Sequence, residues 1–128
     1  MNYLKFAVIL LFCFLNLFSQ TENTTQKSLM FLNKMVNFGD VTSDTTLLAK
    51  FFFVNNGIEP VKIEYVNPDC TCTSYSLSQK TVNVNDTAYV ELQINTSHKY
   101  GYNKIYSTMK ADTHAQMYKL TIIFNITE

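Results

Sequence analysis

The sequence contains no arginine, and all ten of its basic residues are lysines. Arginine is the side chain that forms paired hydrogen bonds with carboxylates, phosphates and guanine bases. The lysines are spread along the chain, and ten acidic residues balance their charge. The chain therefore lacks the basic surface that nucleic-acid binding requires and the basic cluster that attracts anionic membranes, so we expect neither partner.

Glycine is also scarce, with three residues in 128, so a glycine-rich phosphate-binding loop would be difficult to build. The motifs of serine hydrolases (G-x-S-x-G) and of zinc proteases (H-E-x-x-H) are both missing from the sequence. Its two histidines, His98 and His114, fall in predicted loops. Four aspartates, Asp44, Asp69, Asp86 and Asp112, fall in predicted turns, where Asp caps backbone groups. We therefore expect a protein that is not an enzyme and that holds no cofactor.

Residues 1–19 have the pattern of a signal peptide. Lys5 precedes an apolar run at residues 6–18, and a small residue, Ser19, stands at the expected cleavage point. An uncleaved anchor is the alternative, but a membrane-spanning helix needs about 20 apolar residues. Acylation of Cys13 is disfavoured because it would follow the bulky Phe12 and divide the apolar run. We expect an exported protein, whether periplasmic, in the cell envelope or secreted, with no transmembrane segment after cleavage.

After a polar, flexible lead-in at residues 20–28, short apolar segments alternate with turn signals such as Asn55-Asn56-Gly57 and Asn85-Asp86. No window repeats apolar residues with a helical period. The strand-like segments are residues 29–32, 36–41, 47–54, 61–65, 81–84, 88–96, 102–109 and 118–126. About seven short strands in one domain, residues 29–128, predict an all-β antiparallel sandwich.

Alternation within these segments predicts which side chains face the core. Phe51 and Phe53 should lie on one face of their strand, with Phe52 on the other. In the next strand Ile63 and Tyr65 should face inward. Gly39 is expected to mark a bulge in the segment 36–41. Residues 73–80 are rich in Ser and Thr and are not assigned to a strand.

Four short segments of the chain, in order, resemble the motifs of the bacterial DUF1573 family, a domain of unknown function. The family pattern is roughly F-G-x-V, F-x-F-x-N-x-G, P-L-x-I and S-C-G-C-T, followed by a Pro-Gly turn. The matching segments are Phe38-Gly39-Asp40-Val41, Phe51-Phe52-Phe53-Val54-Asn55-Asn56-Gly57, Pro60-Val61-Lys62-Ile63 and Asp69-Cys70-Thr71-Cys72-Thr73. The resemblance implies an immunoglobulin-like sandwich in an exported protein, and it implies no activity. This chain departs from the pattern at Asn85-Asp86, which replaces Pro-Gly, and at Thr71, which replaces the central glycine.

Cys70 and Cys72 are the two cysteines expected in the mature protein, and they are the candidate site. In an extended strand the Cα atoms of residues i and i+2 lie about 6.6 Å apart, near the upper limit of about 6.8 Å for a disulfide. Closing the bridge needs a local bend, which β-branched Thr71 resists. A Cys70–Cys72 disulfide is therefore expected to be strained and easily reduced, if it forms.

Three roles remain open for the pair. The cysteines could be structural, packing the sandwich or bracing it. They could be redox-active, or two thiolates could bind a soft metal such as Cu(I) or Zn(II), although a closed zinc site needs four ligands.

Two functions follow. The first is an exported structural or binding module that docks onto a protein or a cell-envelope component by an edge strand or its end loops. The second is a periplasmic thiol-redox or metal-binding protein that uses Cys70 and Cys72. The specific partner is unknown, and we favour the first function because no catalytic constellation is present in the sequence.

Overall fold

The structure is a computed structural model that describes residues 2, 3, 5 and 26–128. Most of the predicted signal peptide, including Cys13, and residues 20–25 of the lead-in lie outside the described residues. Among those that are described, no helix is long and apolar enough to cross a membrane.

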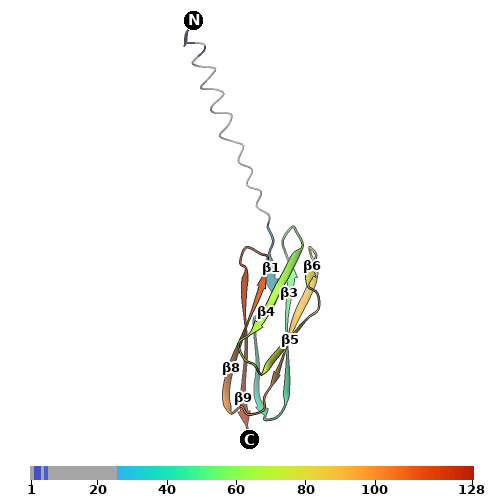
Figure 1. The fold of residues 1–128 in the computed structure, drawn as a ribbon, viewed down its shortest axis with the longest axis vertical. Helices are drawn as coiled ribbons and strands as arrows, with labels where there is room; N and C mark the ends of the chain where they lie inside the picture. Colours follow the sequence, from blue (N-terminus) through green and yellow to red (C-terminus); the bar gives the residue numbers. More distant parts are fainter. Residues whose placement is uncertain (1, 4, 6–25) are drawn as a thin grey trace.

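Residues 26–128 form a β-sandwich of two sheets, which confirms the predicted fold class (Figure 1). The described chain holds nine strands where about seven were predicted: β1 (Leu29–Phe31), β2 (Met35–Thr42), β3 (Thr46–Asn55), β4 (Val61–Pro68), β5 (Thr73–Leu77), β6 (Thr81–Val82), β7 (Thr87–Asn95), β8 (Gly101–Ala111) and β9 (Met117–Thr127). One sheet has the order β1-β3-β7-β5, and the other has the order β2-β9-β8-β4-β6.

The pairing is antiparallel except between β2 and β9, which run parallel. The chain leaves β1 in one sheet and enters β2 in the other, where β2 lies beside the last strand. Local alternation reports which face of a strand is buried and carries no information about a partner 85 residues away. The alternation of apolar residues could therefore not predict that β2 and β9 run parallel.

The core lies between the sheets and consists of the alternate apolar residues that the sequence predicts. Phe51 and Phe53 are fully buried, whereas Phe52 points outward and is 40% exposed. The residues that meet them from β7 and β9 are also fully buried: Val90, Leu92, Ile94, Leu120, Ile122 and Phe124. Burying one such side chain contributes about 1.5–3 kcal/mol, so this layer is the main source of the stability of the domain.

Irregularities in two strands change which side chains face the core. The register of β2 shifts between Asn37 and Asp40, and Gly39 there has φ +67°, which confirms the predicted bulge. A second shift lies in β4 between Ile63 and Tyr65. Because of it Tyr65 is 43% exposed and Val66 is buried instead, so the prediction that Tyr65 faces inward is wrong.

Asn55 ties the β3–β4 turn to β6. Its side chain is fully buried; Nδ2 donates to the carbonyls of Glu59 (2.8 Å) and Val82 (2.9 Å), and Oδ1 accepts from the amide of Gly57 (3.0 Å). A Cβ on Gly57 would collide with the carbonyl oxygen of Gln26. The Asn-x-Gly motif is thus explained by the fold: one residue satisfies three buried main-chain groups, and the other leaves room for the entering chain.

Asp112, in the β8–β9 loop, holds the same end of the sandwich. Its carboxylate accepts hydrogen bonds from Lys27 Nζ (2.6 Å) and from the amide of Lys62 (2.8 Å), and the carbonyl of Gln26 accepts one from Ile58 (3.1 Å). Partial burial works to raise the pKa of Asp112, but the hydrogen bonds from Lys27 and Lys62 and the charge of Lys27 outweigh it, so that pKa is lowered. Residues 26–28 of the lead-in are therefore attached to the domain.

Replacing Asn55 by Ala should lower the free energy of unfolding by about 2–3 kcal/mol, because three buried main-chain groups lose their partner. Urea unfolding followed by circular dichroism measures this. Asn56→Ala is the control, since Asn56 is exposed one residue away and should change stability little. Equal effects of the two changes would contradict the role given to Asn55.

Asp112→Asn should lower the free energy of unfolding at neutral pH by about 1 kcal/mol, since it removes the charge of a half-exposed ion pair. The pKa of Asp112 is lower in the folded state, so its contribution is present above the unfolded value of about 3.9 and is lost as the pH falls through the folded value. The difference between wild type and Asp112→Asn should therefore shrink in urea unfolding below about pH 4. A difference that stays constant down to pH 2 would exclude this role; Asp86→Asn is the control.

Candidate functional site

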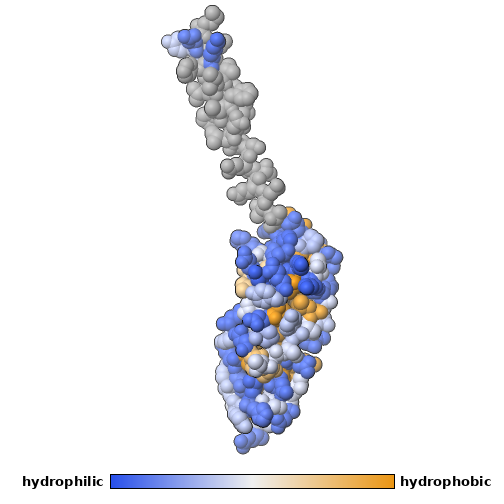
Figure 2. Space-filling model, viewed as in Figure 1, coloured by the Kyte–Doolittle hydropathy of each residue, from blue (hydrophilic) through white to orange (hydrophobic). Residues whose placement is uncertain are grey.

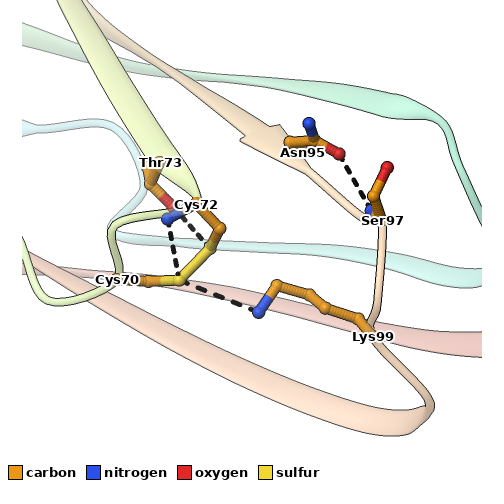
Figure 3. Close-up of a disulfide and its surroundings, with 6 residues drawn as sticks. All are labelled: Cys70, Cys72, Thr73, Asn95, Ser97 and Lys99. Carbon is orange, nitrogen blue, oxygen red and sulfur yellow. Dashed lines mark hydrogen bonds between the residues drawn. A yellow bond between two sulfur atoms is a disulfide. The ribbon is translucent and has the colours of Figure 1, made fainter.

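Cys70 and Cys72 lie in the turn between β4 and β5 and are joined by a disulfide (Figure 3). Their Cα atoms are 5.1 Å apart, closer than in an extended strand. The bend comes from the turn itself, in which the amide of Thr73 donates to the carbonyl of Cys70 (3.1 Å). Thr71 takes part without a positive φ, so a glycine is not required at this position.

The bridge sits where the chain crosses from one sheet to the other. β4 belongs to the five-stranded sheet and β5 to the four-stranded sheet. Before the turn, the amide of Asp69 donates to the carbonyl of Tyr106 (3.0 Å) in β8; after it, the carbonyl of Cys72 accepts from the amide of Asn95 (2.9 Å) in β7. Both cysteines are half-buried against the core, and Thr71 is exposed. The disulfide is thus anchored on both sheets and still borders on solvent.

The two sulfur atoms have different surroundings (Figure 3). Cys70 Sγ accepts a hydrogen bond from the amide of Cys72 (3.1 Å) and lies 3.7 Å from the ammonium group of Lys99. Cys72 Sγ lies 3.4 Å from the hydroxyl oxygen of Thr73. Negative charge would therefore be stabilised on Cys70 much more than on Cys72.

Lys99 reaches the bridge from the β7–β8 loop and was not among the predicted site residues. Thr96, fully buried at the start of this loop, exchanges hydrogen bonds with Thr45: its hydroxyl donates to the Thr45 carbonyl (2.9 Å) and accepts from the Thr45 amide (2.9 Å). The amide of Lys99 then donates to the Thr96 carbonyl (3.1 Å), and His98 takes a φ of +62°. A separation of 29 residues between Lys99 and Cys70 gives no local signal of this contact.

The side chains around Cys70 and Cys72 are relevant to the hypothesis that these two cysteines bind a soft metal. Among the described residues, no group of three or more His, Cys, Asp or Glu side chains could hold a metal ion. With the sulfurs bonded to each other, neither is available as a thiolate ligand. His98 and His114 lie in loops, as predicted, at opposite ends of β8.

A second candidate feature is the open edge of β5, which begins directly after the bridge. This strand was not predicted, because Thr73-Ser74-Tyr75-Ser76-Leu77 is rich in Ser and Thr. In the structure only Thr73 of the five is buried. β5 pairs with β7 in regular register, and no strand of the described residues pairs with its other side. Tyr75 in its centre is 47% exposed. On the face seen in Figure 2, small hydrophobic patches lie among hydrophilic surface.

Comparison with known proteins places the chain in a sequence family without a known role. The family described as "Protein of unknown function (DUF1573)" matches residues 29–126. No curated protein matches the chain.

Solved structures with a similar fold have very different sequences. A protein of unknown function from Porphyromonas gingivalis W83 superposes with a TM-score of 0.70 at 8% identity, over 80% of this chain and 48% of that one, so this chain spans about half its length. The human CEP192 ASH/PapD-like domain (PapD-like domain 7) gives 0.62 at 10% identity, over 81% and 88%. The E. coli chaperone DraB gives 0.50 at 10% identity, over 78% and 55%. At these identities the likeness shows the fold alone.

Proposed function

Because this chain belongs to the DUF1573 family, whose function is unknown, we propose from its own surface that it is an exported, non-enzymatic binding module. It binds an extended segment of another protein, which adds to the four-stranded sheet as a new strand beside β5. The observation that carries this proposal is the open edge of β5. Its main-chain groups and its half-exposed tyrosine form a preorganised site for a strand.

The hydrogen bonds at the two ends of β5 establish which main-chain groups are free. The carbonyl of Cys72 accepts from Asn95, and the amide of Ser78 donates to the carbonyl of Tyr89 (3.0 Å). In an antiparallel ladder the bonded residues alternate, so Ser74 and Ser76 also bond to β7. Tyr75 and Leu77 therefore direct their N–H and C=O groups to the open edge, where no described main-chain group bonds to them.

The other sheet edges are less suited to adding a strand. β1 has three residues and β6 has two. β2 has eight, but the bulge around Gly39 breaks its register, and Asp40 adds a charge. Bulges, charges and short length are the features that protect edges from unwanted pairing. β5 has neither a bulge nor a charged residue, and its five residues keep a regular register.

The side chains of β5 define the chemistry of the partner. Ser74 and Ser76 project outward, whereas Tyr75 and Leu77 lie on the core side of the strand and are only partly covered. An added strand would place alternate residues beside these two, so we expect apolar residues at every second position of the bound segment. The strand has no charged residue, so we expect the segment to be uncharged at its centre.

The similar fold of DraB supports a role in protein interaction, because that protein is a chaperone. The likeness identifies no partner for this chain. The partner is defined here by its chemistry, an extended and alternating apolar segment of a protein.

Tyr75→Pro should weaken this binding while leaving the sandwich intact, since it removes an N–H that points to the open edge and none that bonds to β7. Peptides selected from a random display library on the wild-type domain should bind this variant at least about tenfold more weakly. The reason is that the variant loses one well-placed hydrogen bond and the strand geometry. Titration calorimetry of the selected peptides measures the change.

Tyr75→Thr is the matched comparison, because it loses the ring as Tyr75→Pro does but keeps the N–H and a residue suited to strands. The difference in affinity between the two variants therefore reports the main-chain bond alone. Amide exchange gives an independent test: the Tyr75 and Leu77 amides should exchange fast in the free domain and become protected when a peptide binds, while Ser74 and Ser76 stay protected throughout. Peptides that bind Tyr75→Pro as well as wild type, or that protect another edge, would refute the proposal.

Export predicts a mature chain that begins at Gln20. The intact mass of the protein recovered from the extracytoplasmic fraction of the producing cell should lack residues 1–19. A full-length mass in the membrane fraction would establish an uncleaved anchor instead. A mass with acyl groups on Cys13 would establish a lipoprotein.

A further inference from the structure

The Cys70–Cys72 bridge contributes little as a staple. A disulfide stabilises a fold mainly by restricting the unfolded chain, and the effect grows with the length of the closed loop. Only Thr71 lies between the two cysteines, so the bridge restricts a single turn. The sandwich is held instead by its buried apolar layer. The position and surroundings of the bridge thus call for another explanation.

Thiol–disulfide exchange depends on which sulfur leaves as a thiolate. The attacking thiolate bonds to one sulfur, and the other departs with the electron pair of the broken bond, faster when its negative charge is stabilised. Cys70 Sγ has the Cys72 amide at 3.1 Å and the Lys99 ammonium at 3.7 Å, both placed to stabilise that charge. Cys72 Sγ has the Thr73 hydroxyl alone. Both cysteines border on solvent, so an attacking thiol has access to the bridge.

We propose that the Cys70–Cys72 disulfide is a thiol-exchange site, in which a dithiol reductant attacks Cys72 and Cys70 leaves as a thiolate held by Lys99. The first step breaks the Cys70–Cys72 bond and forms a mixed disulfide between Cys72 and the reductant. The second thiol of the reductant then attacks the reductant sulfur that is bonded to Cys72. The reductant closes to an internal disulfide, and Cys72 leaves as a thiolate. The protein gains two electrons and two protons, and the reductant becomes a disulfide. The reverse sequence closes the bridge and reduces a partner disulfide.

Lys99 gives the proposal a direct test. Oxidised wild type, Lys99→Met, Lys99→Arg and Lys104→Met are reduced with excess dithiothreitol at neutral pH, and free thiols are counted by quenched alkylation and mass spectrometry. Lys99→Met should be reduced about fivefold more slowly, because the leaving thiolate loses a charged partner. Lys99→Arg should restore most of the rate. Lys104, an exposed lysine on β8, is the matched control, and its replacement should leave the rate unchanged.

The attacked sulfur is a second readout, and it needs no variant. Wild type treated with glutathione and then rapidly alkylated should carry glutathione on Cys72 and the alkyl group on Cys70. In Lys99→Met this preference should weaken. The oxidised variants must show the same urea midpoint as wild type, so that a change in rate reports on the site.

Equal reduction rates for wild type and Lys99→Met would overturn the proposal, as would glutathione distributed equally between the two cysteines. Either result would make the bridge a passive element of the turn. Slow reduction of Lys99→Met with rescue by Lys99→Arg, together with glutathione on Cys72, would establish it.

Discussion

The apolar layer between the two sheets is the interaction on which every other feature of this domain depends. Phe51 and Phe53 from one sheet and Leu120, Ile122 and Phe124 from the other are fully buried. The disulfide cannot substitute for this layer, because it closes a ring that contains one intervening residue. Since both sheets must bury their inner faces, the chain has to cross between them, and each crossing produces a turn at the rim of the core. The Cys70–Cys72 bridge lies in one of those crossings.

Strands whose alternate residues are fully buried could be predicted from the sequence. β3, β7 and β9 each repeat an apolar residue at every second position, and each was placed within a few residues of its observed bounds. The pattern failed where burial is partial or irregular. β5 exposes most of its side chains, so it carries almost no alternation. The bulge in β4 moves Tyr65 to the surface, and an inserted residue cannot be seen from composition alone.

The cysteine pair of the candidate site could be predicted from the sequence, but its geometry and its contact with Lys99 could not. Two cysteines separated by one residue stand out in a chain with so few, so the pair could be singled out without a structure. Its geometry could not, because the Cα separation of 5.1 Å results from a turn whose carbonyl and amide groups are aligned by β4 and β5. The contact between Lys99 and Cys70 could not be predicted from the sequence, for a related reason. The position of Lys99 depends on the partly buried Thr96–Thr45 hydrogen bonds, which join two loops that are distant in the sequence.

The crossings also limit how strongly an added strand could bind at the open edge of β5 in the mode that we propose. β5 begins at the bridge and ends where the chain turns toward β6, and the carbonyl of Lys80 is already bonded to the amide of Ile63 (2.8 Å) in the other sheet. Between these ends Tyr75 and Leu77 offer four main-chain groups, and each hydrogen bond adds only about 0.5–1.5 kcal/mol. Main-chain pairing of this length holds two copies of the domain together weakly, which keeps an uncharged edge from causing self-association. A partner of the kind proposed would therefore gain its affinity from side chains that pack beside Tyr75 and Leu77. In that binding mode, sequence recognition and protection from self-pairing would both follow from the shortness of the strand.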